Sequence, residues 1–280
     1  MKTLTTVKDI RAALAQERCS GHSISFVPTM GNLHDGHMAL VRAGRKATDC
    51  VVASIFVNPM QFGQNEDLDA YPRTLEQDQE KLAREGVKYL FAPTAREMYP
   101  HGVNTQIIVP VLSNILCGAS RPGHFSGVAT ICSKLFNIVQ PDIAVFGEKD
   151  YQQLTIIRHM VDDLCIPLRI VGVETGRAQD GLALSSRNQY LSDNERAVAS
   201  VLYAALAEAK DKLLAGERNY YEVEQAAIEK LQAAGLRTDY FHIMSRDYLE
   251  APTSVDRELV ILAAAQLGKA RLIDNVQLDL

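Results

Sequence analysis

Two histidines stand three positions apart in the segment His34–His37, shortly after the apolar run Ile24–Met30. The run predicts a buried strand ending at Pro28, and the chain is expected to restart as a helix near Gly36, with both imidazoles on one side of the first turn. Asp35 is expected to cap this helix. These features predict a binding site for the phosphates of a nucleotide, because the first helical turn offers unpaired N–H groups, the positive helix end and two imidazoles. The alternative is a strand-to-helix turn whose histidines are merely solvated.

Two later segments could add further side chains to such a nucleotide-binding site. In Gly147–Asp150, expected to open a helix after a strand, Lys149 offers a compact charge to phosphate and Asp150 two acceptors to ribose hydroxyls. In Leu184–Asn188, two hydroxyls and a guanidinium can follow the oxygens of a triphosphate. The alternatives are an ordinary helix start for the first segment and a solvated turn for the second.

The motifs that most often bind nucleotides are missing from the sequence. It has no G-x-x-x-x-G-K-[ST] and no G-x-G-x-x-G, so neither a P-loop nor a dinucleotide fingerprint is available. A two-histidine turn with a distant serine loop is typical of nucleotidyltransferases that attack the α-phosphate of ATP. Such a site needs no covalent nucleophile: it aligns the acceptor and stabilises the departing pyrophosphate, usually with Mg²⁺ on the triphosphate.

Neutral amides suggest where an acceptor would bind. Gln61 lies in Phe56–Phe62, after the second expected strand, and Gln153 lies one helical turn beyond Lys149. Neutral donors could hold a nucleophilic carboxylate without quenching it as a tight arginine pair would. Arg121, in a turn leading into a helix, could contact phosphate or carboxylate. For each of these side chains the alternative is an exposed position with no ligand.

The elements that must position these residues follow from hydrophobic patterning. Apolar runs that read as buried strands alternate with helical patterns, which predicts an α/β fold with a doubly wound, Rossmann-like parallel sheet covered by helices on both faces. The expected strands are Ser23–Val27, Val51–Val57, Tyr89–Ala92, Asp142–Phe146 and Leu168–Val173. Ligands of such sheets bind at the carboxyl ends of the strands, so one shared cleft is expected.

The pattern changes in the last third of the chain. A long amphipathic helix over 198–213 and a second near 223–231 precede apolar strands at 240–244 and 259–265, which predicts a smaller α+β domain with an antiparallel sheet. We therefore expect a domain over 1–176 that binds the nucleotide and its acceptor, and a lid carrying the serine loop over 177–280.

Composition narrows the class of protein. The 280 residues are 47% hydrophobic, and a net charge of −5 without a basic stripe argues against a nucleic-acid partner. The five cysteines are widely spaced and include no Cys-x-x-Cys pair, as suits a reducing cytosol. No segment approaches the ~20 apolar residues needed to span a bilayer, so a soluble, unprocessed cytoplasmic protein without a membrane partner is expected.

Taken together and in this order, the motifs resemble those of the pantoate–β-alanine ligase (pantothenate synthetase) family. That family belongs to the nucleotidyltransferases that share the two-histidine tetrad and the serine loop with class I aminoacyl-tRNA synthetases. The segments that carry the resemblance are Pro28–His37, Phe56–Phe62, Tyr71–Thr74, Arg121–Phe125, Gly147–Asp150, Asp180–Asn188 and Ala270–Asn275.

The resemblance implies that pantoate attacks ATP to give pantoyl adenylate and pyrophosphate, and that β-alanine then displaces AMP to give pantothenate. It also implies Mg²⁺ with ATP as co-substrate, no tightly bound organic cofactor, and a homodimer formed through the first domain. It makes His37, His34, Lys149 and Arg187 the catalytic residues. We assign His37 an electrostatic role, because a carboxylate nucleophile has no proton to lose.

The resemblance also distributes the ligand contacts. The implied ATP-binding residues are Met30, His34, Gly36, His37, Gly147, Lys149, Asp150, Gly176, Leu184, Ser185, Ser186 and Arg187. The implied pantoate-binding residues are Gln61, Gln153, Pro28, Met30 and Arg121, and Val128 and Ile131 would add to the apolar wall of that site. Gln61 also lies near the β-alanine position, and Asp78 matches a position associated with the metal.

Two positions depart from the family pattern. The family usually has proline where this chain has Glu174, and a larger apolar residue where it has Gly176. Glycine at the second position keeps backbone hydrogen bonds to adenine and loses apolar contact, so weaker ATP binding is expected. The alternatives are another adenylate-forming enzyme or a cytidylyltransferase, and a non-catalytic adenine-nucleotide binding module. The products separate them, since AMP release that requires an amine is expected only of the ligase.

Overall fold

The structure is a computed structural model of the chain, and it describes residues 1–63, 68 and 71–280. Backbone contacts divide the chain into two compact units. The first comprises Met1–Glu148 with Gln153–Glu174, and the second comprises Lys149–Gln152 with Thr175–Leu280. The division into a substrate-binding domain and a lid stays a prediction.

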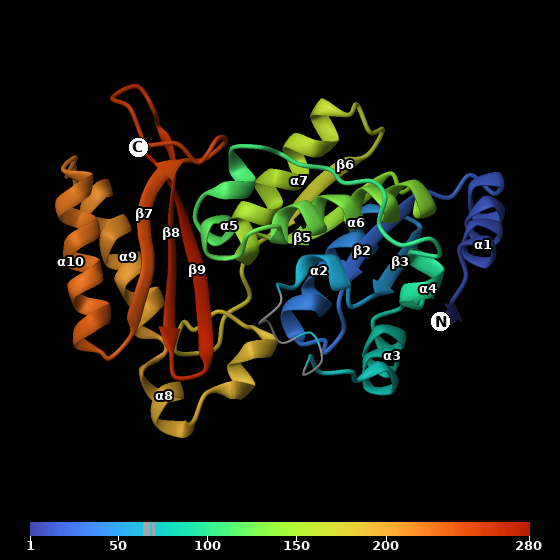
Figure 1. Cartoon of the computed structure of the whole chain (residues 1–280), viewed down its shortest axis with the longest axis horizontal. Coiled ribbons are helices and arrows are strands. Elements are labelled where there is room, and N and C mark those ends of the chain that lie inside the picture. Colours follow the sequence, from blue (N-terminus) through green and yellow to red (C-terminus); the bar gives the residue numbers. More distant parts are fainter. Residues whose placement is uncertain (64–67, 69–70) are drawn as a thin grey trace. The chain divides into compact units, whose positions relative to one another are not determined.

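A parallel sheet forms the centre of the first unit. Among the described residues it has six strands in the order β1-β4-β3-β2-β5-β6, with crossovers that place β2 between β3 and β5 (Figure 1). The strands are β1 (Lys2–Leu4), β2 (Ile24–Thr29), β3 (Cys50–Ile55), β4 (Tyr89–Phe91), β5 (Ile143–Gly147) and β6 (Arg169–Val173). This confirms the predicted α/β class.

Helices lie between these strands, as the alternation of apolar runs with helical patterns predicts, and shorter turns complete the connections. The helices are α1 (Val7–Cys19), α2 (Asp35–Ala47), α3 (Leu75–Arg84), α4 (Ala95–Met98), α5 (Cys117–Ser120), α6 (His124–Val139) and α7 (Tyr151–Asp163). Of these, α1, α4 and α5 were not expected from the sequence. The 3₁₀ turns are η1 (Pro59–Gln61), η2 (Leu112–Asn114) and η3 (Glu148–Asp150).

Neighbouring residues of the central strands serve the two faces of the sheet. Val27 packs in a cluster with Val41 of α2 and Leu82 of α3. Phe26, one position earlier, meets Phe136 of α6 edge to face at 6.5 Å. Because successive side chains of a strand point to opposite faces, α2 and α6 cover different faces, as the sequence predicts. Each fully buried apolar side chain of this size contributes about 1.5–3 kcal/mol to folding.

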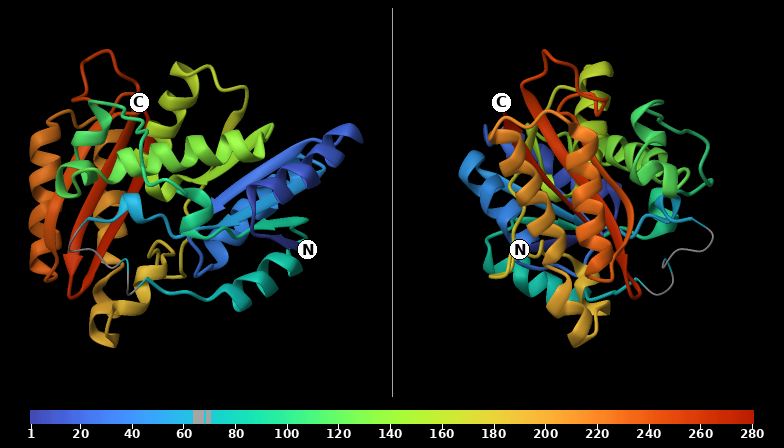
Figure 2. Two further views of the ribbon diagram at one scale, coloured as in Figure 1. Left: turned by 45° about the vertical axis from the view of Figure 1, so that its right-hand side comes forward. Right: turned by 90° about the vertical axis from the view of Figure 1, so that its left-hand side faces the viewer.

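The second unit is built on an antiparallel sheet with helices on one face. Within the described part of the chain the sheet has three strands in the order β7-β8-β9. Its elements are η4 (Ser186–Tyr190), α8 (Asp193–Val198), α9 (Val201–Leu214), α10 (Tyr220–Ala233), β7 (Arg237–Ser245), β8 (Glu258–Leu267) and β9 (Ala270–Asp279). Helices α9 and α10 lie side by side on it (Figure 2), which confirms the predicted α+β arrangement.

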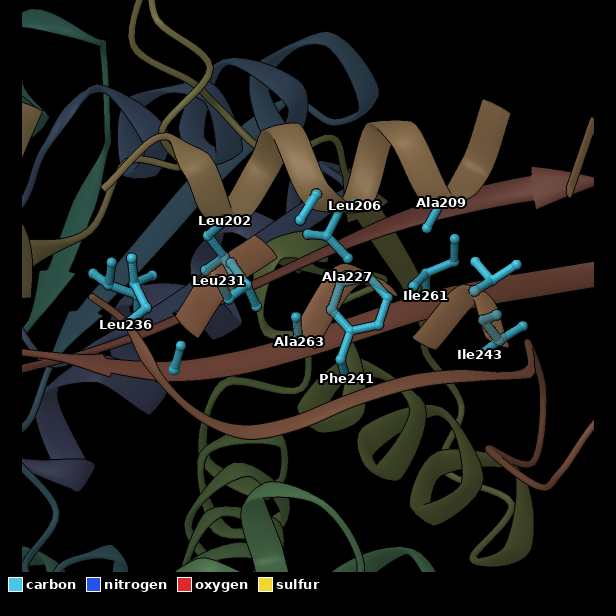
Figure 3. Packing of buried hydrophobic residues seen from close by; sticks show 14 of the residues in the cluster. Leu202, Leu206, Ala209, Ala227, Leu231, Leu236, Phe241, Ile243, Ile261 and Ala263 are labelled. Carbon is cyan, nitrogen blue, oxygen red and sulfur yellow. The ribbon is translucent and has the colours of Figure 1, made fainter. Parts of the chain in front are cut away.

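Apolar side chains between these helices and the sheet form the core of the second unit. Leu202 and Leu206 of α9 face Phe241 of β7 and Ile261 of β8 (Figure 3). The expected helix over 198–213 is interrupted, since α8 ends at Val198 and α9 begins at Val201. Strands β1 and β9 were not expected from the sequence. No helix in the described residues is both long and apolar enough to cross a membrane.

Candidate active site

Both histidine rings are fixed by hydrogen bonds to the backbone at the start of α2. His34 is the N-cap: its Nδ1 accepts a hydrogen bond of 3.2 Å from the backbone N–H of Gly36. His37 reaches back, and its Nδ1 accepts one of 3.2 Å from the backbone N–H of His34. This reciprocal pair is a capping box built from imidazoles instead of a hydroxyl and a carboxylate. The expected cap, Asp35, is wrong, because the extended backbone at His34 makes that residue the last one before the helix.

The capping box also sets the chemistry of the rings. A neutral imidazole has one donor and one acceptor nitrogen, so using Nδ1 of each ring as acceptor assigns the proton to Nε2. The ring centroids of His34 and His37 are 4.1 Å apart, so the two Nε2–H donors come from adjoining rings. The predicted placement of both imidazoles on one side of the first turn is therefore confirmed.

A buried carboxylate holds the loop that precedes this turn. Asp78, in the first turn of α3, accepts hydrogen bonds of 2.8 Å from the backbone N–H groups of Asn32 and Leu33, and one of 3.0 Å from the Thr74 hydroxyl. Gly31 (φ +88°) and Asn32 (φ +51°) adopt left-handed backbone conformations there. The Asp78 oxygens thus stabilise a tight turn between β2 and the histidines.

This environment bears on the metal role expected of Asp78, which stays a prediction. Mg²⁺ prefers carboxylate and water oxygens in octahedral geometry, and here the carboxylate is fully buried and already accepts three hydrogen bonds. Within the part of the chain that the structure describes, no group of three or more histidine, cysteine, aspartate or glutamate side chains is arranged to hold a metal.

Gln61, predicted to bind the acceptor, has a fixed side chain. Its Nε2 donates to the Sδ of Met30 at 3.0 Å, and its Oε1 accepts from Asn58 Nδ2 at 3.3 Å. Asn58 is itself buried and held by the Tyr99 hydroxyl, which donates to its Oδ1 at 2.8 Å, and by the Gly127 carbonyl, to which it donates at 3.1 Å. The structure therefore brings Met30 and Gln61 together and adds Asn58, which no local sequence pattern singles out.

The side chain of Arg121 contacts the backbone of the same segment, since its Nη2 donates to the Gln61 carbonyl oxygen at 3.4 Å. His124 Nδ1 lies 2.8 Å from the Gln61 carbonyl oxygen, and Arg121 Nη1 lies 3.0 Å from His124 Nε2. Since a carbonyl can only accept, Nδ1 carries the proton and Nε2 accepts from the arginine. Helix α6 approaches this turn closely at Gly127, where an added Cβ would lie 2.4 Å from the Met60 carbonyl oxygen.

The other residues predicted to bind the acceptor also lie in the first unit. Pro28 lies on β2 opposite Ser54 of β3, Gln153 lies on α7, and Val128 and Ile131 are buried on α6.

The second unit contains the other predicted phosphate contacts. Lys149 lies in η3, directly after Gly147 ends β5, and its Nζ is 3.7 Å from Asp150 Oδ1. Ser185 caps η4, with its hydroxyl accepting from the Arg187 backbone N–H at 3.3 Å. Leu184 precedes it and donates its backbone N–H to the Gly176 carbonyl at 2.8 Å. The serine loop therefore follows a short hairpin and is itself a 3₁₀ turn.

Comparisons with known proteins agree with the motifs. Residues 2–277 match the family model for pantoate-beta-alanine ligase. The chain is 58% identical to a pantothenate synthetase of Pseudomonas fluorescens Pf-5, over 100% of this chain and 99% of that protein. The crystal structure of pantothenate synthetase from Thermus thermophilus is 47% identical, with a TM-score of 0.93 and 99% of each chain covered.

A further solved structure contains ligands. It is the pantoate-beta-alanine ligase of Francisella tularensis complexed with beta-gamma ATP and beta-alanine, which is 34% identical with a TM-score of 0.83, covering 99% of this chain and 97% of that one. With a family model across nearly its whole length and relatives of this identity, this chain belongs to the pantoate–β-alanine ligase family.

Proposed function

We propose that this ligase activates pantoate as an enzyme-bound pantoyl adenylate before joining it to β-alanine. A carboxylate oxygen of pantoate attacks the α-phosphorus of ATP, and the bond to the bridging oxygen breaks with release of pyrophosphate. The amine of β-alanine then attacks the acyl carbon, the bond to the phosphate oxygen breaks, and AMP leaves while the amine loses a proton to solvent. The products are pantothenate, AMP and pyrophosphate.

The imidazole capping box is the observation that carries this proposal. With Nδ1 of His34 and His37 engaged with the backbone, each ring carries its proton on Nε2, at the N-terminal end of α2. Donors fixed before the reaction need no reorganisation as negative charge grows on a splitting triphosphate. A helix N-terminus adds its own positive end to that field. His37 and His34 are therefore proposed to stabilise the transition state electrostatically.

Further residues are proposed to bind ATP. Lys149 and Arg187 supply positive charge, and Ser185 and Ser186 supply hydroxyls to the phosphates. ATP is proposed to enter as its Mg²⁺ complex, with the ion held chiefly by phosphate oxygens and water, which is how Mg²⁺ usually binds nucleotides. Gly36, Gly147, Asp150, Gly176, Leu184 and the backbone of Met30 are proposed to line the remaining nucleotide surface.

The acceptor site is proposed to be centred on Gln61. An amide nitrogen has two N–H groups, so one can donate to Met30 Sδ while the other binds an oxygen of pantoate. Asn58 holds the amide in this orientation. Neutral donors from Gln61 and Gln153 would align the carboxylate and leave its nucleophilicity intact. Pro28 and Met30 are proposed as apolar wall, Arg121 as a further contact of pantoate, and β-alanine is proposed to bind next to Gln61.

We also propose that the chain forms a homodimer through its first unit. Three apolar side chains of the segment before η2, Val103, Ile108 and Val111, are exposed, and a second copy would cover them. Sedimentation velocity on the wild-type chain and on Ile108→Asp tests this, with a dimer expected for the first and a shift toward monomer for the second.

Isotope exchange tests the adenylate. Labelled pyrophosphate should enter ATP in a reaction that requires pantoate and needs no β-alanine, because formation of the adenylate is reversible. Replacing pantoate by β-alanine is the control and should give no exchange. Absence of pantoate-dependent exchange in enzyme that still makes pantothenate would contradict a pantoyl adenylate.

A further inference from the structure

A bidentate ion pair lies inside the second unit, between residues that the motifs do not assign to any ligand. Arg177 Nη1 donates to Asp274 Oδ2 at 2.6 Å, and Nη2 donates to Oδ1 at 3.0 Å. The Asp274 side chain is 2% exposed and that of Arg177 19%. Burial raises the pKa of the Asp274 carboxyl, and the guanidinium opposes that shift. A desolvated fork of this kind fixes direction as well as distance.

Arg177 also holds the hairpin that leads into the serine loop. Its Nη1 donates to the Gly181 carbonyl at 3.1 Å, and its guanidinium lies 3.8 Å from the centre of the Tyr203 ring. The backbone of Arg177 pairs with Ala183, two residues before Ser185. The ion pair therefore fixes the base from which the loop projects.

Asn275 extends the same network to the lysine segment. Its backbone N–H donates to Asp274 Oδ1 at 2.8 Å, and its carbonyl accepts from Arg177 Nη2 at 3.3 Å. Its side-chain Nδ2 donates to the carbonyl oxygen of Lys149 at 3.0 Å. Asn275 is 4% exposed, so its side chain is held in a partly buried contact.

These contacts explain why a short segment of the parallel-sheet region belongs to the second unit. Residues Lys149–Gln152 group with the second unit, although the chain on both sides of them groups with the first. Hydrogen bonds tie this short segment to the second unit: among them, Asn275 donates to the Lys149 carbonyl, and the Tyr151 hydroxyl donates to the Arg246 carbonyl at 3.3 Å. Asp274 and Asn275 thus connect the lysine segment to the hairpin of the serine loop through one short stretch of β9.

We propose that Arg177, Asp274 and Asn275 are positioning residues that hold Lys149 and the Ser185–Arg187 loop at a fixed spacing from each other. The inference rests on the proposed function, in which both segments bind the phosphates of ATP. Phosphate donors act on a transition state only if they are held in place beforehand, and an error of about 1 Å can cost about 100-fold in rate. None of the three side chains needs to touch the substrate.

A double-mutant cycle tests this on the full-length chain. Asn275→Ala removes the donor to the Lys149 carbonyl, and Asn275→Asp replaces it with an acceptor at nearly constant volume. Each is expected to lower kcat of pantoate-dependent pyrophosphate exchange by about 10- to 100-fold, with a smaller change in KM for pantoate. In a Lys149→Ala background the same changes should have little further effect, because residues that act through one another are not additive.

Arg271→Ala is the matched control. Arg271 lies on the same strand, and its Nε donates to Asp239 Oδ2 at 2.7 Å, so the variant loses a polar contact of β9 that does not lead to Lys149. Its kcat is expected to stay within about twofold of wild type, because the Arg271–Asp239 pair is partly exposed and lies outside the network of Arg177, Asp274 and Asn275. Arg177→Lys keeps the charge and loses the fork, and an intermediate kcat is expected.

The outcomes distinguish failure of the positioning role from failure of the proposed function of Lys149. Equal losses from Asn275→Ala with and without Lys149, or losses that follow the fraction of unfolded protein in both Asn275 variants, would overturn the positioning role alone. If Lys149→Ala left exchange unchanged, both the role of Lys149 and the inference built on it would fall.

Discussion

The carboxylate of Asp78 accepts a hydrogen bond of 2.8 Å from the backbone N–H of Leu33, the residue before the first histidine of the site. With the hydrogen bond of equal length from the backbone N–H of Asn32, it fixes two consecutive N–H groups in the turn between β2 and α2. Lys81, one helical turn further along α3, donates to the Leu33 carbonyl at 2.6 Å. Helix α3 thus determines where α2 begins.

Asp78→Asn is expected to destabilise the chain. An amide places an N–H group where a carboxylate oxygen accepted one, and leaving a buried backbone donor unpaired costs about 1–3 kcal/mol. We expect a lower melting temperature and a raised KM for ATP. Thermal melting with and without Mg²⁺ measures this, since a structural role gives the same fall in both.

Asp35→Asn is the control for Asp78, because it makes the same chemical change at an exposed residue, the first of α2. A melting temperature for Asp78→Asn equal to that of wild type, together with a raised requirement for Mg²⁺, would favour the metal role instead.

His37→Gln separates capping from catalysis. Glutamine at the third helical position can accept the N-cap N–H, as in an ordinary capping box, so the start of α2 should persist. The Nε2–H donor is lost, and kcat is expected to fall about 10²-fold or more at a nearly unchanged melting temperature.

His37→Ala loses both the cap and the donor. It is expected to show the same fall in kcat and, in addition, a loss of stability of about 0.5–2 kcal/mol. Steady-state kinetics and thermal melting of the two variants make the comparison. A His37→Gln variant with wild-type kcat would show that the imidazole serves the helix and not the reaction.

Much of this site follows from local sequence, and the remainder depends on contacts between distant residues. The run Ile24–Val27 predicts β2 because four consecutive buried side chains suit a strand covered on both faces. By contrast, Arg177 and Asp274 are 97 positions apart, and no local pattern pairs them. The role of Asp78 was missed for the same reason, since its partners lie 45 and 46 positions earlier.

Short-range errors have a different origin. Asp35 was expected to cap α2 because aspartate is a strong N-cap residue, whereas His34 takes that place through an uncommon imidazole acceptor. Strand β1 has only three residues, too few for a periodic pattern. Strand β9 mixes buried Asp274 and Asn275 with apolar residues, which obscures its alternation.

A buried glutamate predicts how stability depends on pH. Glu17 accepts from Lys88 Nζ and from the Tyr89 hydroxyl, each at 2.7 Å, and also contacts His22. The hydrogen bonds from Lys88 and Tyr89 lower its pKa to about 2, against an ordinary value of 4.5. A carboxyl whose pKa is depressed by folding stabilises the fold above its unfolded pKa, so this contribution should be lost as pH falls from 4.5 toward 2.

Glu17→Gln is therefore expected to lower the melting temperature by about 2–5 °C at pH 7 and to flatten its pH dependence in the acid range. Melting curves from about pH 7 to about pH 3 measure both effects, since this range spans the unfolded pKa of a carboxyl. Glu80→Gln, which removes an exposed pair with Arg84, is the control and should match wild type. Parallel pH profiles for wild type and Glu17→Gln would contradict the assignment.

Restoring an apolar side chain at position 176 is expected to strengthen ATP binding. The Gly176 carbonyl accepts from the Leu184 N–H at 2.8 Å, a backbone contact that any residue can make. Gly176→Val should therefore keep the hairpin and add apolar area against adenine, worth about 1 kcal/mol or roughly fivefold in Kd. Calorimetry with a non-hydrolysable ATP analogue measures this. Glu174→Pro is the control: it restores the family's usual residue at an exposed position and should leave the Kd for the ATP analogue unchanged. Tighter binding by both variants, or by neither, would contradict a direct contact between residue 176 and adenine.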